Sequence, residues 1–402
     1  FFIDDVVAGY ALVETARVNG HNIEWYGPIP SGPSYLKSFR SRLSVLKTIW
    51  SHSRYLKKLR RNTPVPVQEL RACDILILDW AMPSSFVKDA HTNRVGKLNR
   101  IPQILRDAGF RIGFIANPIS WVSTHKEITD RALSAKDPVV MLNDLRSVRS
   151  AIEAAWNTWR MIKNLSRRFV FKETNLSPLF ELECNRDLAS TRSIDAYTFS
   201  KIAMNLAKWK VCPKVIVFPF ENQGWERALI HGFHQYQPKT KIIAYQHSPF
   251  SRRHLSFFCS RENIKKNRIP DQLMLTGDHF KSLYIKKGYP EDKLLVVGGL
   301  NFEMLLDAAP KKYIENKKFK NILCTTSIEL RDSLDLIIKA IFALENMENS
   351  HLIVNFHPVL NDTIREEIVR ITHPLALEKC IDIKFSKASS NVLVQQADLV
   401  LY

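Results

Sequence analysis

Side chains able to take part in acid–base chemistry follow two apolar runs in the middle of the chain. The runs are residues 214–220 (KVIVFPF) and 241–245 (KIIAY), whose β-branched and aromatic composition predicts buried strands. The polar residues that follow them are Glu221, Asn222, Gln223, His247 and Ser248. Because the carboxyl ends of parallel strands open into the ligand crevice of an α/β sheet, we expect a carboxylate, two amides and an imidazole to meet there.

A carboxylate beside an imidazole at one sheet edge predicts a general base or a nucleophile. Glu221 is the first catalytic candidate; its alternative role is to meet the positive end of the macrodipole of the helix that follows. Glu226 lies about one turn further along that helix and is a second candidate, unless it pairs with Arg227 or with a strand residue. His247 is the third candidate, with a structural hydrogen-bonding role as the alternative.

Other polar and glycine positions near these strand ends are expected to line the acceptor side of the same crevice. The stretch 251–266 is polar and basic and predicts a loop at the crevice mouth, and the apolar run 293–297 ends at a pair of glycines. The expected acceptor-side residues are Asn222, Gln223, Ser248, Arg252, Gly298 and Gly299.

A second set of candidates follows strands in the last quarter of the chain. The run 351–356 (HLIVNF) ends at His357, and the proline after it blocks continuation of the ladder and fixes the turn. Hydroxyls follow the neighbouring predicted strand, 321–325. We expect a nucleotide phosphate to be bound by His357, Pro358, Thr326, Ser327 and Arg331. The alternatives are a structural turn for the histidine and a helix N-cap for the hydroxyls.

The elements that position these residues predict an α/β protein. A chain of 402 residues is too long for one ordinary core, and its strands alternate with helices as in doubly wound parallel sheets. We predict two Rossmann-like domains facing a central cleft: 1–308, with a helical insertion at about 120–211, and 321–402 after a lysine-rich linker at 309–320. The sequence stops on a predicted strand, so we expect the natural chain to continue.

Missing motifs argue against dinucleotide oxidoreductases, P-loop NTPases and α/β-hydrolases. The sequence has no GxGxxG after a strand, no Walker A motif, no GxSxG elbow and no HExxH. Its six cysteines form no CxxC pair, which predicts free thiols and no zinc site. Only 13 glycines are present, so the remaining option is a ligand held by helix N-termini, histidine and hydroxyls.

The net charge of +18 indicates an anionic partner. Residues 35–61 carry nine Lys or Arg and no acidic residue, interleaved with Trp, Phe and Leu at nearly helical spacing. This pattern suits an anionic membrane surface; the alternative is a helix packed on its own domain with a solvated basic face. Nucleic acid is not expected, because no binding motif accompanies the charge. No apolar run approaches the roughly 20 residues of a membrane-spanning helix.

Four stretches together resemble bacterial surface-carbohydrate proteins of O-antigen and capsule loci. They are ENQGWERAL (221–229), YQHSPF (245–250), the run 270–299, and the His357-Pro358 turn. The chain looks related to GT-B glycosyltransferases, including those that use CMP-activated Kdo or sialic acid. The resemblance covers roughly 214–402, and its strength is in the order of the motifs.

This resemblance implies a metal-independent glycosyltransferase without a cofactor, acting in lipopolysaccharide, O-antigen or capsule assembly. It would move a sugar from a nucleotide donor, with CMP-Kdo favoured, to a glycan or lipid-linked acceptor bound by the first domain. The pair His357-Pro358 would contact the nucleotide phosphate and Glu221 would be the base or nucleophile. The expected location is cytoplasmic and peripheral, at the inner face of the bacterial inner membrane. The alternatives are a GT-B-like epimerase, a polyol-phosphate transferase, or a non-catalytic scaffold of the assembly complex.

Overall fold

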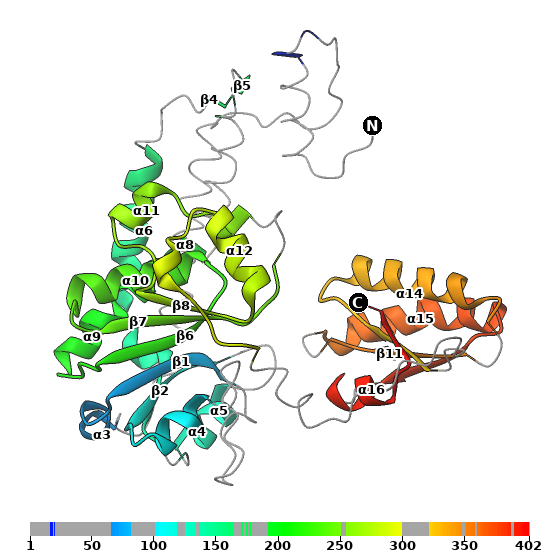
Figure 1. Cartoon of the computed structure of the whole chain (residues 1–402), viewed down its shortest axis with the longest axis horizontal. Coiled ribbons are helices and arrows are strands. Elements are labelled where there is room, and N and C mark those ends of the chain that lie inside the picture. Colours follow the sequence, from blue (N-terminus) through cyan, green and yellow to red (C-terminus); the bar gives the residue numbers. More distant parts are fainter. Residues whose placement is uncertain are drawn as a thin grey trace. The chain divides into compact units, whose positions relative to one another are not determined.

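The chain divides into two units, Phe1–Asp307 and Ala308–Tyr402, which are described one at a time. The computed structural model describes residues 66–81, 101–118, 125–133, 137–163, 170–171, 174–175, 192–250, 255–299, 321–347, 350–357, 360–386 and 390–401, with 17, 18, 20, 135 and 177 (Figure 1). Four features predicted from the sequence lie outside these ranges: the basic segment 35–61, the linker 309–320, Arg252 and Pro358.

Unit 1 is built on a sheet whose seven described strands are all parallel. Their spatial order is β3-β2-β1-β6-β7-β8-β9. The strands are β1 (Ile75–Ala81), β2 (Ile112–Pro118), β3 (Val139–Met141), β6 (Val215–Phe220), β7 (Lys241–Gln246), β8 (Gln272–Leu275) and β9 (Leu294–Val296). A parallel sheet is covered on both faces, and its central strands are therefore nearly continuous apolar runs. The predicted parallel, helix-covered sheet is confirmed.

Helices cover both faces of this sheet: α8, α9 and α10 lie over one face and α4 and α5 over the other (Figure 1). The helices of unit 1 are α3 (Val67–Arg71), α4 (Ile101–Asp107), α5 (His125–Leu133), α6 (Val148–Lys163), α8 (Arg192–Ser200), α9 (Ile202–Lys208), α10 (Gly224–Tyr236), α11 (Arg261–Lys265) and α12 (Asp278–Lys286). Short 3-10 turns occur at Leu142–Leu145, Leu255–Phe257 and Glu291–Lys293, and β4 (Val170–Phe171) pairs with β5 (Thr174–Asn175).

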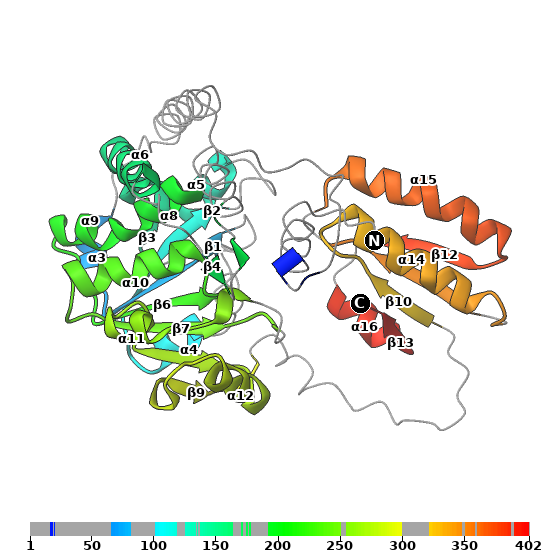
Figure 2. The same ribbon diagram turned by 90° about the horizontal axis from the view of Figure 1, so that it is seen from above.

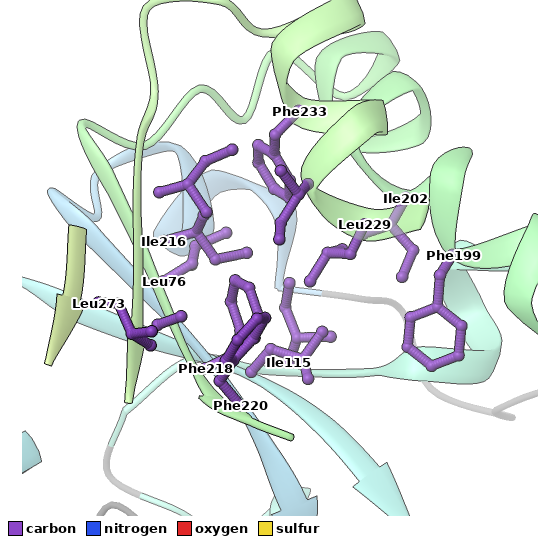
Figure 3. Close-up of a cluster of buried hydrophobic side chains, with 14 of the residues drawn as sticks. Leu76, Ile115, Phe199, Ile202, Ile216, Phe218, Phe220, Leu229, Phe233 and Leu273 are labelled. Atoms are coloured by element: carbon purple, nitrogen blue, oxygen red, sulfur yellow. The ribbon is translucent and has the colours of Figure 1, made fainter. Parts of the chain in front are cut away.

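The larger core of unit 1 lies between the sheet and α8, α9 and α10 (Figure 3). Alternation along the strands sends Phe218 and Phe220 into this core, where Leu229 and Phe233 of α10 meet them. The helices approach closely at Gly232. A Cβ atom there would lie 2.2 Å from the backbone oxygen of Ser200 on α8, so a glycine is required at this crossing.

The sheet is doubly wound about the boundary between β1 and β6. The chain runs from β1 outward to β2 and β3, and later resumes at β6 on the other side of β1. Ladder pairs between β1 and β6 run from Ile75↔Val215 only to Ile77↔Val217, whereas β6 pairs with β7 along its whole length. The N–H of Val215 points to β1, and orientations repeat every second residue. Pro219 therefore also faces β1 but has no N–H to donate.

The region 120–211 is not the purely helical insertion that the sequence analysis predicted. Within it, Val139–Met141 forms β3, which pairs with β2 at the edge of the main sheet. Two of the three residues in the short run VVM are β-branched valines, and the run finds a partner strand, so tertiary pairing outweighs helical spacing. Helix α6 begins only at Val148, and α8 and α9 cover the sheet itself.

Unit 2 contains a four-stranded parallel sheet in the order β12-β11-β10-β13. Its strands are β10 (Asn321–Thr325), β11 (His351–Asn355), β12 (Asp382–Ser386) and β13 (Leu399–Leu401), and its helices are α14 (Leu330–Leu344), α15 (Asp362–Glu378) and α16 (Ser390–Gln396). Helices α14 and α15 cover one face of the sheet and α16 the other (Figure 2). The predicted α/β class with two parallel sheets is thus confirmed. Among the described helices of both units, none is long and apolar enough to cross a bilayer.

Candidate active site

The carboxyl end of β6 turns sharply into α10. Glu221 follows the last strand residue, and Asn222 adopts φ +57°, a left-handed conformation that asparagine tolerates better than most residues. This reversal lets α10 begin at Gly224. The turn places Glu221 beside the boundary between β1 and β6, where doubly wound sheets bind their ligands.

Glu226 holds this turn in place. Its carboxylate accepts the backbone N–H of Glu221 at 3.0 and 3.1 Å and that of Gln223 at 2.9 Å. The side chain is almost completely buried. Burial raises the pKa of Glu226 to about 8, while the N–H groups of Gln223 and Glu221 act in the opposite direction. The structure therefore places this carboxylate on the backbone of the turn, where it positions Glu221.

Three side chains converge on the carboxylate of Glu221. His247 Nε2 lies 3.0 Å from Oε1, and the Ser248 hydroxyl donates to the same oxygen at 2.9 Å. The amide of Gln223 donates to Oε2 at 2.6 Å. The side chain of Glu221 is 30% exposed whereas that of His247 is 4% exposed. The carboxylate is thus reachable from solvent while its imidazole partner is packed behind it.

This arrangement can move a proton. An ionised carboxylate held by two donors on one oxygen has lone pairs left to accept a hydroxyl proton from a ligand. The imidazole can stabilise the carboxylate when it donates to it, and its burial restricts the orientation of the pair. The sequence predicted that residues after two different strands would meet, and the structure brings Glu221, Gln223, His247 and Ser248 together.

Gln246, at the end of β7, was missed by the sequence analysis. Its side chain is fully buried and donates to the carbonyl of Ser248 at 2.5 Å. Its Oε1 accepts the Thr276 backbone N–H at 3.1 Å and the Thr276 hydroxyl at 2.8 Å. This amide fixes the loop that carries His247 against the end of β8. The available signal was a glutamine inside an otherwise apolar strand end.

Asn222, predicted to line the acceptor side, is buried and holds a different loop. Its Nδ2 donates to the carbonyl of Ser256 at 2.5 Å, and its Oδ1 accepts from Arg227 Nε at 3.0 Å. Arg227 also donates to Ser256 at 2.9 Å. The alternative pairing of Glu226 with Arg227 is therefore replaced by an Asn222–Arg227 contact.

Aromatic residues pack around the turn between β6 and α10. Trp225 donates through Nε1 to Gln223 Oε1 at 3.1 Å, and its ring packs edge-on against Trp80 of β1, with centroids 6.0 Å apart. Rings of Phe199 and Phe218 lie within 6.3 Å of it. Trp225 thus ties the start of α10 across the boundary to β1, so the turn has little freedom to shift.

The predicted glycine pair follows the edge strand β9. Gly298 adopts φ +92°, and its carbonyl accepts from the hydroxyl of Tyr245 at 3.3 Å. Tyr245 precedes Gln246 on β7, so this glycine reaches back toward the strand that carries His247. Gly299 is partly exposed.

In unit 2 the ends of β10 and β11 are joined through one threonine. The Thr326 hydroxyl accepts the backbone N–H of His357 at 2.8 Å, and the Thr326 N–H donates to the carbonyl of Asn355 at 3.0 Å. Ser327 lies before α14, where its hydroxyl accepts from Glu329 N–H at 3.3 Å. The predicted phosphate-binding residues His357, Thr326 and Ser327 therefore gather at one sheet edge.

Arg331 is exposed in the first turn of α14. A second arginine at the same sheet edge was missed: Arg365, in the first turn of α15, has its guanidinium 6.0 Å from the ring centroid of Phe356 and NH1 3.3 Å from Asp362 Oδ1. Its position beside the residue that precedes His357 adds a cation to this edge. An arginine one turn into the helix after the His-Pro turn was the signal available in the sequence.

Within the part of the chain that the structure describes, no three His, Cys, Asp or Glu side chains gather as metal ligands. The described cysteines, Cys73, Cys212, Cys259, Cys324 and Cys380, are free thiols. Independence from metals and cofactors stays a prediction from the sequence.

No protein-family model matches the sequence, and no curated protein matches it. Solved structures do match. The chain is similar to UDP-GlcNAc 2-epimerase from Neisseria meningitidis bound to UDP-GlcNAc, with 14% identity, a TM-score of 0.41, and coverage of 81% of this chain and 76% of that one. It is also similar to a glycosyltransferase from Rickettsia africae, with 12% identity, a TM-score of 0.42, and coverage of 81% of this chain and 71% of that one. A third similar structure is HepE from Anabaena in complex with UDP and glucose, with 13% identity, a TM-score of 0.40, and coverage of 82% of this chain and 73% of that one.

Proposed function

We propose that this chain is a metal-independent glycosyltransferase of the GT-B type that acts in bacterial surface-polysaccharide biosynthesis. It transfers a sugar from a nucleotide donor, with a CMP-activated acidic sugar such as CMP-Kdo favoured, to a glycan or lipid-linked acceptor. The observation that supports this most is the partly exposed Glu221 carboxylate, held by His247 and Ser248 at the boundary where a doubly wound sheet binds ligands.

Sugar transfer assigns a role to each group in this arrangement. The acceptor hydroxyl gives its proton to the Glu221 carboxylate while its oxygen bonds to the anomeric carbon. The bond from that carbon to the donor phosphate breaks, and the nucleotide leaves with the electron pair. In the alternative, double-displacement route, Glu221 attacks the anomeric carbon and the nucleotide leaves with the electron pair of the broken bond. The acceptor oxygen then displaces the carboxylate, which takes up the hydroxyl proton. His247 keeps the carboxylate oriented in either route.

The edge of unit 2 supports the other half of the reaction. Departure of a nucleotide requires stabilisation of negative charge on its phosphate. Hydroxyls, the imidazole of His357, and the cations Arg331 and Arg365 lie at or near one edge of a parallel sheet. We assign the nucleotide to this unit and the acceptor to unit 1, as the family resemblance implies.

A second candidate, a sugar-nucleotide epimerase, is favoured by the same Glu221–His247 contact. The Glu221 carboxylate, held by His247 at 3.0 Å, can remove a proton from a carbon of the bound sugar and return one to the other face once the planar intermediate has turned that face toward it. This reaction needs no acceptor, so it is separable from transfer by experiment.

The test uses the purified full chain with CMP, CDP, UDP and GDP, followed by the sugar donors of whichever nucleotide raises the melting temperature. Transfer predicts nucleotide release that depends on an added glycan acceptor. Epimerisation predicts that the configuration of one sugar carbon inverts without an added acceptor and that this carbon takes up deuterium from the solvent. A response to CMP alone favours an acidic-sugar donor. No thermal shift and no turnover with any of them would remove both enzyme assignments and leave the scaffold.

We also propose that the protein works at the inner face of the bacterial inner membrane. The basic, aromatic-rich composition of residues 35–61 supports this location, since it matches the surface of an anionic bilayer. Deletion of 35–61 is expected to move the protein from the membrane fraction to the soluble fraction of the cell. An unchanged distribution would contradict the role of this segment.

A further inference from the structure

Helix α6 exposes two large apolar side chains on the side opposite its packing face. Ile152 is 52% exposed and Trp156 is 57% exposed. The packing face consists of Ala151, Ala154 and Ala155, which are buried and contact Tyr197 of α8. Burial of small side chains on one face and exposure of large ones on the other is the reverse of what a helix fully covered by its own domain shows.

Arginines flank these apolar residues along the same side of the helix. Arg149, Ile152, Trp156 and Arg160 are spaced by three, four and four residues, which keeps all of them within roughly 80° around an axis that turns about 100° per residue. Both arginines are exposed. We refer to these four residues as the outer stripe. Its order along α6 is cation, two apolar groups, cation.

Among the described residues, one acidic side chain borders the outer stripe, and its charge is offset. A carboxylate oxygen of Glu153 lies 3.4 Å from Arg149 Nε, and the other lies 3.5 Å from Lys201 Nζ of the neighbouring segment. Two exposed arginines and Lys201 against one glutamate leave this surface positive. The stripe therefore combines a positive charge with exposed apolar area.

We propose that the outer stripe docks on the surface of an anionic lipid bilayer, with α6 lying parallel to the membrane plane. Tryptophan is enriched at membrane interfaces, where its indole lies at the level of the headgroups. Ile152 would reach the acyl-chain boundary beside it, and Arg149 and Arg160 would bind lipid phosphates while their alkyl stems lie along the apolar surface. The net charge of +18 favours an anionic bilayer over a neutral one. The outer stripe lies outside segment 35–61 in the sequence, and its proposed role does not depend on the proposed reaction.

The first test measures co-sedimentation of the full chain with vesicles made of phosphatidylcholine alone or of phosphatidylcholine and phosphatidylglycerol in equal parts. The double variant Ile152→Ser/Trp156→Ser is expected to bind the mixed vesicles at least about tenfold more weakly than wild type. Ile104→Ser on α4 is the matched control, because Ile104 is equally exposed at 54% but lies outside the stripe. Its binding is expected to equal wild type. Unchanged binding of the double variant, or equal loss in the control, would overturn the proposal.

The second test locates Trp156 directly. The emission of wild type minus that of Trp156→Phe isolates this indole, and the phenylalanine variant keeps an apolar group at the site. We expect this difference signal to shift to the blue with mixed vesicles and to be quenched by brominated phosphatidylcholine. Arg149→Gln and Arg160→Gln are each expected to weaken binding to the mixed vesicles roughly fivefold, with no change for neutral ones. A difference signal unaffected by brominated lipid would place Trp156 in water and refute the contact.

Discussion

The Nε2 atom of His247 lies 3.0 Å from the Oε1 atom of Glu221, although the two residues follow different strands of the sheet. The contact depends on the pairing of β6 with β7, whose register sets Phe220 opposite Gln246 and so places the next residue of each strand side by side. A carboxylate and an imidazole are thus brought together by sheet register, with backbone turns on either side holding them.

Replacing Glu221 by glutamine is expected to lower kcat/KM at least roughly 100-fold, because the amide cannot accept a proton or attack carbon. The amide still accepts from Ser248, so the fold should be preserved. Turnover is measured alongside the melting temperature. Glu262→Gln on α11, an exposed glutamate that forms an ion pair with Lys266, is the control and should keep wild-type activity. A fully active Glu221→Gln protein would disprove a role in proton transfer.

Two substitutions of His247 separate orientation from packing. His247→Gln keeps a donor toward the Glu221 carboxylate, whereas His247→Phe fills the buried space without one. We expect the phenylalanine variant to lose roughly 10- to 100-fold in kcat with little change in the KM for the donor, since a displaced carboxylate mainly affects the chemical step. The glutamine variant should retain more. A phenylalanine variant as active as wild type would show that the ring only fills space.

The raised pKa of Glu226 predicts that the free energy of unfolding depends on pH. The ordinary pKa of a glutamate is 4.5, and burial raises the pKa of Glu226 to about 8 in the folded chain. Between these values the folded state binds more protons than the unfolded state, so the free energy of unfolding falls as pH rises, by up to a few kcal/mol. Urea denaturation across this range should show the decline in wild type and a smaller one in Glu226→Gln. The same decline in both would mean that this carboxyl stays ionised, with its three N–H contacts outweighing burial.

Gly232 and Gly224 form a matched pair on α10. A methyl group at Gly232 would meet the backbone of Ser200 at 2.2 Å, whereas one at Gly224 would make an ordinary 3.8 Å contact with Ala196. Gly232→Ala is therefore expected to cost about 3 kcal/mol of unfolding free energy, because backbone cannot move aside as a side chain can. Gly224→Ala should change stability by less than about 1 kcal/mol. Denaturant titration of both variants checks the difference, and similar values would show that α8 relaxes.

Apolar runs made the sheet predictable, and through it part of the site. Residues 214–220 and 241–245 match β6 and β7 almost residue for residue, because a strand buried on both faces leaves few other interpretations. The meeting of Glu221 with His247 follows from parallel topology alone. Edge strand β3 was missed because three residues carry too weak a pattern and its partner is supplied by the fold.

Side-chain direction was the part that sequence could not supply. Glu226 could face the ligand or the backbone, and its position on α10 allows both; the uncapped N–H groups of the turn decide in favour of the backbone. Asn222 likewise occupies a candidate position, but its amide is used by Ser256 and Arg227. Such choices depend on which buried groups need partners.

Pro219 limits the pairing of β1 with β6 beside Glu221 through its covalent structure. Neither ligand binding, temperature nor loop movement can give a proline an amide proton. The end of the ladder between β1 and β6 is therefore set by the covalent structure of the chain. Any other residue at this position would restore that proton and allow the ladder between β1 and β6 to extend further toward Glu221.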